Sequence, residues 1–253
     1  MRRTWLVVLG MLPMLQAWAE VRTAPGPACL DARRMAEMRQ PSPGTLAVLD
    51  QDGRRFRIDL GTECPQADEP GAQLLARDGW VCGGAQEYVS AGEALCPVSG
   101  VTAIDARAYA ELARAAVLAQ DDMETMEAVQ VHEARRRGFG GSYSYCFSPR
   151  YLRSWSEDPT GLLVELSPKH SGGNRFYRVE LAGSCPELDS SPAIVFRSGM
   201  DIGLICGNPG DQIVAIDNRV PAGPALGPAL RFRCNISAVY PHESTGPADT
   251  AAN

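Results

Sequence analysis

Eight cysteines carry the most informative chemistry in this sequence. In chain order they are Cys29, Cys64, Cys82, Cys96, Cys146, Cys185, Cys206 and Cys234. None of them belongs to a C-x-x-C motif, which argues against the simplest redox and zinc sites. An even number of cysteines predicts structural disulfides if the chain folds in an oxidising compartment, with free or reactive thiols as the alternative.

The N-terminal residues predict such a compartment. Arg2 and Arg3 precede an apolar run over residues 5–15, and Ala17-Trp18-Ala19 follows as an A-x-A cleavage site. This is the pattern of a secretory signal peptide over residues 1–19. The apolar run is shorter than the roughly 20 residues that a transmembrane helix needs, which disfavours the alternative of a retained anchor. We therefore expect an exported, soluble protein, periplasmic or secreted, with no integral membrane segment after cleavage.

The chain contains the same unit twice. Residues 29–50 (CLDARRMAEMRQPSPGTLAVLD) align without gaps to residues 146–167 (CFSPRYLRSWSEDPTGLLVELS). Further along, FRIDLGTECP is similar to YRVELAGSCP, GWVCGG to GLICGN, and CPVSGV to CNISAV, so every cysteine has a counterpart. We define the first copy as residues 29–104 and the second copy as residues 146–242. A helical linker is expected over 105–140, and a disordered tail over 243–253.

Each copy shows the apolar alternation of β-strands. Phe56, Ile58 and Leu60 alternate with charged residues, and Asp52-Gly53 just before them predicts a hairpin turn, as does Gly172-Gly173 in the second copy. Later strands are expected at 80–82, 88–89, 97–104, 202–206, 212–216 and 230–240. The expected fold is mainly β with an α-helical connector. It comprises two small antiparallel β-domains, barrel- or sandwich-like, each stapled by disulfides because its core is small.

The pairing of the cysteines is open, because four cysteines in each copy permit three arrangements. We favour the nested arrangement, which joins the first strand of each copy to its last strand. It pairs Cys29 with Cys96, Cys64 with Cys82, Cys146 with Cys234 and Cys185 with Cys206.

The linker has the features of a helix. Asp105 is a candidate N-cap, and Ile104 and Tyr109 stand at the positions of a hydrophobic staple. The helix either continues to Arg137 or breaks near residues 120–122. Its apolar seam either packs on a neighbouring β-domain or supports self-association with another chain. The seam consists of Tyr109, Leu112, Ala116, Ala119, Met123 and Met126.

Motifs for catalysis are missing from the sequence. It has no G-x-S-x-G nucleophile elbow, no histidine pair at i and i+4, and no glycine-rich phosphate loop. We therefore assign no catalytic residue, no cofactor and no metal ligand. Four aromatic residues, Tyr143, Tyr145, Tyr151 and Trp155, are candidates for a face that binds a sugar or a partner protein. The alternative is that they border the core of the second copy.

The order of motifs in the second copy, CFSPRYLRSWSEDPTGLLVEL, then RFYRVELAGSCPEL, then RCNISAV, carries a family resemblance. It resembles the small cysteine-containing exported bacterial proteins that are known only as a domain of unknown function. The first copy departs from that pattern, with Met38 where Trp155 stands in the second copy. The resemblance implies a periplasmic β-domain and no particular activity.

Charge and motifs together narrow the function. The net charge is −6, and the 24 basic residues are dispersed, which excludes the electrostatic footprint of a nucleic-acid-binding protein. We expect a non-catalytic binding or interaction protein of the bacterial envelope, whose partner is an envelope protein or a small ligand. The alternative is a small secreted hydrolase or an enzyme inhibitor. A titratable cluster in a cleft between the copies would favour catalysis.

Overall fold

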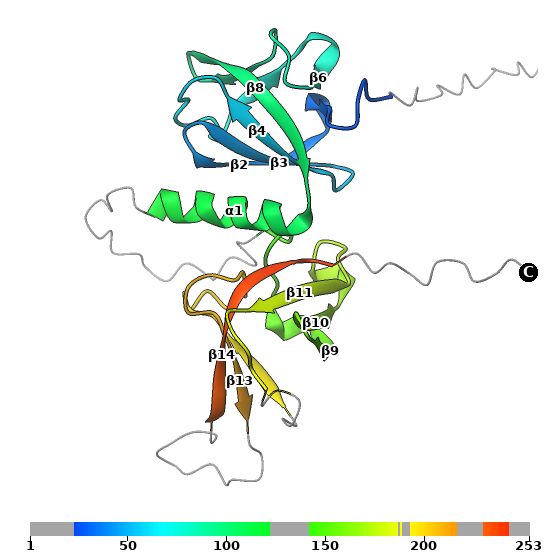
Figure 1. The fold of residues 1–253 in the computed structure, drawn as a ribbon, viewed down its shortest axis with the longest axis vertical. Helices are drawn as coiled ribbons and strands as arrows, with labels where there is room; N and C mark the ends of the chain where they lie inside the picture. The colour runs from blue at the N-terminus through cyan, green and yellow to red at the C-terminus, as the bar shows by residue number, and fades with distance from the viewer. Residues whose placement is uncertain (1–22, 122–141, 187, 189–192, 217–229, 243–253) are drawn as a thin grey trace, which may run out of the picture.

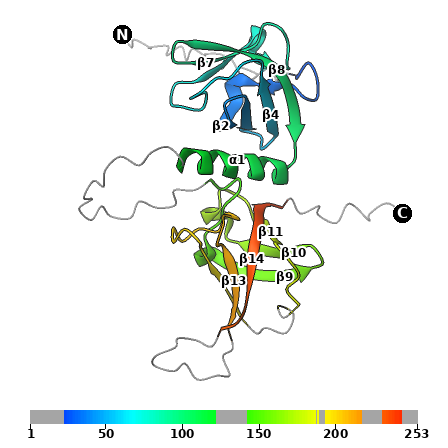
Figure 2. The same ribbon diagram turned by 60° about the vertical axis from the view of Figure 1, so that its left-hand side comes forward.

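A computed structural model describes residues 23–121, 142–186, 188, 193–216 and 230–242 of the chain. The expected signal peptide, the linker beyond residue 121 and the tail lie outside these residues. Helix α1 (Ala106–Asp121) lies between two β units in both views (Figures 1 and 2). The expected fold class is confirmed: the structure is mainly β, with two curled antiparallel sheets of six strands each.

The first copy forms one of these sheets, in the order β2-β3-β4-β8-β7-β5, and a small two-stranded sheet, β1-β6. Its strands are β1 (Leu30–Asp31), β2 (Met35–Ser42), β3 (Thr45–Asp50), β4 (Arg55–Leu60), β5 (Gln73–Leu75), β6 (Trp80–Val81), β7 (Tyr88–Ala91) and β8 (Ala94–Ile104). Its 3-10 helices are η1 (Ala32–Arg34) and η2 (Arg77–Gly79). The predicted hairpin around Asp52-Gly53 is confirmed, because β3 and β4 pair in antiparallel fashion on either side of it. Gly53 adopts a φ of 82°, which glycine tolerates without steric cost.

The second copy repeats this topology. Its sheet has the order β9-β10-β11-β14-β13-β12, which matches the first sheet strand for strand. An isolated bridge between Phe147 and Ile205 stands where β1 and β6 pair in the first copy. The strands are β9 (Leu152–Asp158), β10 (Gly161–Leu166), β11 (Phe176–Leu181), β12 (Ile194–Arg197), β13 (Gln212–Ile216) and β14 (Leu230–Pro241), and the 3-10 helices are η3 (Pro149–Tyr151) and η4 (Pro168–His170).

Each copy has its own apolar core. Burial of these side chains is the main term that stabilises each sheet, at roughly 25 cal/mol per Å² of apolar surface. In the first copy the fully buried members are Leu30, Leu46, Val48, Ile58, Cys64, Ala67, Val81 and Val89. In the second copy they are Phe147, Leu162, Val164, Tyr177, Val179, Leu188, Ile205, Ile213 and Val239.

The cysteines form four disulfides, two within each copy, which confirms that they are structural. The expected nested pairing is wrong. The bridges are Cys29–Cys82, Cys64–Cys96, Cys146–Cys206 and Cys185–Cys234. Sheet pairing explains the difference, because β1 follows Cys29 and pairs with β6, which ends next to Cys82. Equivalent cysteines are joined in both copies, which supports the duplication.

A buried carboxylate holds the loop after the third cysteine of each copy. In the first copy, Glu87 Oε2 accepts hydrogen bonds from the backbone N–H groups of Cys82 (2.8 Å) and Gly83 (2.6 Å). In the second copy, Asp211 occupies the equivalent position and is fully buried. Its Oδ2 accepts from Cys206 (2.9 Å), Gly207 (3.0 Å) and Asn208 (3.0 Å), and its Oδ1 accepts from Gly199 (2.8 Å).

Candidate functional site

The junction between the copies is formed by helix α1. The predicted N-cap is confirmed, because Asp105 Oδ1 accepts a hydrogen bond from Ala108 N at 2.8 Å. Tyr109, Ala110 and Ala113 are fully buried, in a cluster with Ala47 of strand β3 and with residues of the second copy. Of the predicted seam, Tyr109 and Ala116 are buried within the chain and Leu112 packs against the same cluster, which leaves these residues inaccessible to a second chain, whereas Ala119 is exposed. Met123 and Met126 lie outside the described residues.

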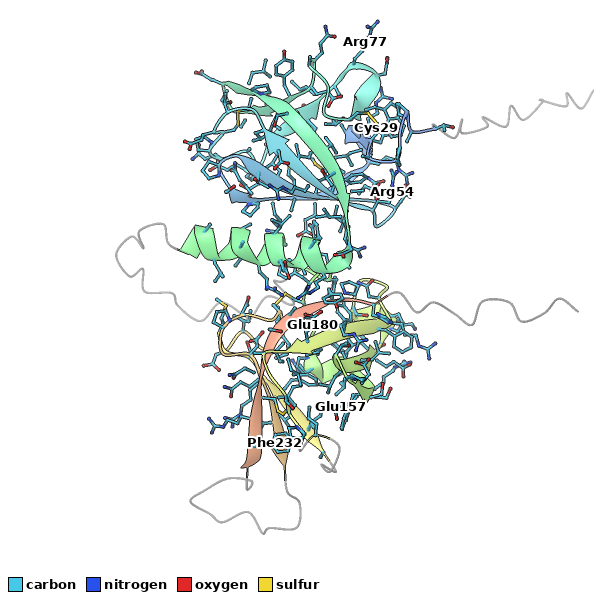
Figure 3. All side chains as sticks on the ribbon, viewed as in Figure 1. Cys29, Arg54, Arg77, Glu157, Glu180 and Phe232 are labelled. Atoms are coloured by element: carbon cyan, nitrogen blue, oxygen red, sulfur yellow. A yellow bond between two sulfur atoms is a disulfide. The ribbon has the colours of Figure 1, made fainter. Side chains whose placement is uncertain are left out.

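Two arginines of helix α1 fasten it to the second copy. The side chain of Arg107 pairs with Glu180 at 3.1 Å, and Glu180 also accepts a hydrogen bond from Tyr240 at 2.7 Å. Glu180 lies on the second copy close to the helix in Figure 3. Arg114 donates to the backbone oxygen of Cys206 at 3.3 Å, and burial lowers the pKa of its guanidinium. These polar contacts to the second copy add to the apolar packing of the helix, which involves both copies.

A polar cluster connects strand β2 of the first copy to the segment that leads into the second. Ser142 and Ser144 both direct their hydroxyls at Glu37 Oε2, at 2.8 and 3.2 Å, and they also contact each other. The other carboxylate oxygen of Glu37 accepts from Arg39 Nε at 2.8 Å. Ser142 Oγ in turn accepts the backbone N–H of Ser144 at 3.2 Å, a local serine turn. The cluster thus links the copies across 105 residues of sequence.

This cluster lies in a cleft of about 340 Å³ between the two copies. The first copy contributes Glu37, Asp50 and Arg55 to its lining, from strands β2, β3 and β4. The second side contributes Tyr143 and Asn174, besides the two serines. The cleft therefore presents carboxylate, guanidinium, hydroxyl and amide groups to one space, which suits a small polar ligand or a peptide segment.

The carboxylate of Glu37, which lines the cleft, is paired with Arg39 at 2.8 Å. Burial lowers the pKa of Arg39, but the hydrogen bond and the charge of Glu37 outweigh it and raise that pKa overall. Burial raises the pKa of Tyr109 well above its usual range, and the nearby Glu37 charge raises it further. Burial also raises the pKa of Tyr145. Both phenols therefore remain neutral at physiological pH, and Glu37 and Arg39 form an ion pair at the base of the cluster.

The four candidate aromatic residues do not form one face. Tyr145 is buried in the junction cluster, and Trp155 packs against the core of the second copy. Tyr143 lines the cleft, where Tyr177 donates a hydrogen bond to its backbone oxygen at 2.7 Å. Tyr151 is 39% exposed and stacks on His170 with ring centroids 4.1 Å apart. The alternative, that such residues border the core of the second copy, holds for Trp155, whereas Tyr145 belongs to the junction cluster.

Two further findings bear on the type of site. Within the residues that the structure describes, no group of three or more His, Cys, Asp or Glu is placed to hold a metal ion. In the same residues, no helix is long and apolar enough to cross a membrane. Neither His170 nor His242 lines the cleft.

Sequence reasoning missed Glu37, Ser142, Arg55 and Asn174 as members of one site. They come from segments far apart in the chain, and no motif connects them. The alignment of the two copies contains one signal that could have identified Glu37: it aligns with Ser154, and Arg39 aligns with Ser156, so the charged pair occurs only in the first copy.

The fold and the junction define the protein as a duplicated, disulfide-stapled β-protein with a polar cleft between its copies. Comparison of the chain with family models, curated proteins and solved structures found no significant match.

Proposed function

We propose that this chain is an exported, non-catalytic binding protein of the bacterial envelope, whose ligand occupies the cleft between the copies. The observation that carries the proposal is the cleft itself, which both copies line with polar groups. Four disulfides fit folding in an oxidising compartment, in agreement with the signal peptide that the first nineteen residues predict. The ligand class is a small polar molecule or a segment of an envelope protein.

The rigidity of the junction supports a binding role. Helix α1 contacts both copies through buried side chains and through Arg107 and Arg114. The two walls of the cleft are therefore held at a fixed distance before any ligand arrives. Preorganisation of this kind reduces the entropy lost on binding.

A cleft-filling variant tests this proposal. Gln51 is exposed and lines the cleft, so Gln51→Trp fills the space without disturbing a core. Gln73→Trp is the matched control, because Gln73 is exposed on strand β5, an edge strand of the same sheet, and does not line the cleft. We expect ligand-observed NMR with mixtures of sugars, amino acids and dipeptides to find binders for the wild type and for Gln73→Trp. Binders that Gln51→Trp retains in full would refute the cleft as the site.

A secreted hydrolase is the second candidate, because Ser142 Oγ lies 2.8 Å from a carboxylate oxygen of Glu37. A serine next to a base is the arrangement of an activated nucleophile. Two contacts favour the structural role instead: Glu37 is held by Arg39, and Ser142 accepts the N–H of Ser144. Assays with chromogenic esters, peptides and glycosides decide between the candidates. Turnover that Ser142→Ala and Glu37→Gln both abolish, with the fold intact, would establish the hydrolase.

A further inference from the structure

The hairpin between the second and third long strands differs between the copies in length and in charge. In the first copy, Asp52 of this hairpin pairs with Arg34 at 2.6 Å, and Asp50 pairs with Arg54 at 2.8 Å. In the second copy the hairpin, residues 167–175, is four residues longer by alignment and carries no acidic residue. It contains Lys169, the only lysine of the chain. The hairpin of the first copy therefore has its acidic residues paired with arginines, whereas the hairpin of the second copy is basic.

Other basic side chains surround this hairpin. Arg150 precedes Tyr151 at the end of η3, and the ring of Tyr151 stacks on His170 of the hairpin. Backbone hydrogen bonds join the same segments, from Ser167 N to Tyr151 O at 3.1 Å and from Leu166 N to Arg175 O at 2.8 Å. We define the basic patch by its exposed members, Arg150, Arg153, Lys169, His170 and Arg175.

Only part of this charge is compensated. Glu165 pairs with Arg175 at 2.8 Å and accepts a hydrogen bond from Ser154 at 2.7 Å, and the charge of Arg153 acts on it as well. In the part of the chain that the structure describes, Arg150 and Lys169 form no ion pair. Four cations and one carboxylate leave a formal charge of +3 with His170 neutral, on a chain whose net charge is −6. Such a concentration of positive charge on an acidic protein attracts anions.

The hairpin is held rigidly. Ser171 is buried, and its hydroxyl donates to the backbone oxygen of Ser167 at 3.0 Å and also contacts Asn174 O. Asn174 Nδ2 donates to Tyr143 O at 3.1 Å. Gly172 adopts a φ of 62° and packs so closely on the ring of Tyr143 that a Cβ would lie 2.8 Å from it. Lys169, His170 and Arg175 therefore stand on a loop whose backbone is already ordered before any ligand binds.

We infer that the basic patch binds an acidic oligosaccharide, a sugar chain that carries carboxylate or phosphate groups. Guanidinium groups match the geometry of carboxylate and phosphate, and several of them spaced along a surface suit a chain of repeated charges. Tyr151 is 39% exposed and one face of its ring is stacked on His170, so this aromatic pair provides an apolar surface beside the cations on which a sugar ring packs. None of the five patch residues lines the cleft, although Gly172 and Asn174 of the same hairpin do, and the ligand inferred here is independent of the ligand proposed for the cleft.

Binding of hexagalacturonate to the full chain, measured by titration calorimetry, tests the inference. The probe is compared with maltohexaose, inorganic phosphate and vesicles of phosphatidylglycerol. The test variant combines Arg150→Gln and Lys169→Gln, the two cations that form no ion pair in the described part of the chain. The matched control combines Arg77→Gln and Arg197→Gln, because both arginines are exposed and distant; Arg77 lies at the far end of the first copy in Figure 3.

We expect hexagalacturonate to bind the wild type and the control variant, and to bind the test variant about tenfold or more weakly, since charge-assisted contacts are lost. Raising the salt from about 50 to about 300 mM should weaken binding by screening. Tyr151→Ala keeps every charge, so it should weaken hexagalacturonate binding and leave phosphate binding unchanged. Gln51→Trp, which fills the cleft, should have no effect, so failure of the cleft proposal is seen separately.

Three results would overturn the inference. Equal weakening in the test and control variants would show attraction by net charge alone. Equal binding of maltohexaose would show that the acidic groups are not recognised. Binding of the vesicles without binding of hexagalacturonate would assign the patch to a membrane surface.

Discussion

The fully buried carboxylate of Asp211 gives the sharpest test of how the second copy is held together. The substitution Asp211→Asn keeps the size of the side chain but replaces one oxygen with an amino group. If the remaining oxygen keeps the three bonds from Cys206, Gly207 and Asn208, then the new amino group faces the N–H of Gly199. Two donors then oppose each other in a buried site.

The magnitude follows from these contacts. Loss of one charge-assisted hydrogen bond costs about 1.5–3 kcal/mol, and the three remaining bonds weaken when the acceptor loses its charge. We expect Asp211→Asn to lower the free energy of unfolding of the second copy by about 3–5 kcal/mol, a large part of the stability of an ordinary domain. Glu87→Gln should cost less in the first copy, because Glu87 accepts two such bonds rather than four.

Urea unfolding followed by tryptophan fluorescence measures both effects. In the chain without residues 1–19, which contain Trp5 and Trp18, Trp80 lies in the first copy and Trp155 in the second, so Trp80→Phe and Trp155→Phe backgrounds report on one copy at a time. The control is Asp201→Asn: Asp201 is exposed and adopts a φ of 53°, which asparagine tolerates. A cost for Asp211→Asn no larger than that of the control would refute the reasoning.

Three further predictions concern the copies separately. In thermal unfolding, Gly207→Ala should destabilise the second copy by about 3 kcal/mol or more. Gly207 has a φ of 78°, and a Cβ there would lie 2.8 Å from Arg114 Nη1 and 2.9 Å from Ala238 Cα. The control is Gly53→Ala, which has a similar φ but open space around it and should cost only about 1–2 kcal/mol in the same assay. Gln40→Glu should lower the free energy of unfolding by about 1–3 kcal/mol, because Gln40 Nε2 donates a hydrogen bond to Cys64 O at 2.6 Å and a carboxylate has no proton to donate. Urea unfolding measures this effect, and Gln66→Glu is the control because Gln66 is exposed nearby. Equal effects of the two substitutions would contradict the role of the hydrogen bond. Hydrogen bonds from Thr160 and then Arg178 lower the pKa of Asp158 from 3.8 to about 2, so the stability that the Asp158 carboxylate contributes is complete above pH 4 and is lost as the pH falls toward 2. The difference in unfolding free energy between wild type and Asp158→Asn should therefore shrink over that window, from about 1 kcal/mol after screening of a side chain that is 37% exposed. A difference that stays constant with pH would exclude the ion pair as its source.

The sequence allowed the central strands of each sheet to be predicted. Strand β4 lies between two neighbouring strands and has one face in the core, so every second side chain is apolar. Phe56 and Ile58 therefore alternate with charged residues, which made the strand recognisable. The edge strands β2 and β9 were missed, since most of their residues are only half buried and β2 contains Pro41. Residues 202–206 were expected as a strand, but only Ile205 forms a bridge, because Asp211 draws the backbone of residues 206–208 into a loop.

The cleft could not be predicted for a different reason. Glu37 and Ser142 meet only because helix α1 folds back between the copies, and that contact depends on tertiary packing. The disulfide pairing depends in the same way on which strands are neighbours, which spacing along the chain does not reveal. The repeat itself was readable because the cysteines and glycines of both copies kept their order.

The interleaved bridges have a consequence for biogenesis. In each copy the first cysteine is joined to the third and the second to the fourth, so no bridge joins neighbouring cysteines. If the chain is exported, as we propose, an oxidant that joins thiols in the order in which they leave the translocation channel makes Cys29–Cys64 first, a bridge absent from the folded protein. Such a bridge is corrected only by thiol–disulfide exchange. The yield of the folded protein should therefore depend on a disulfide isomerase in the compartment where it matures, and not on an oxidase alone.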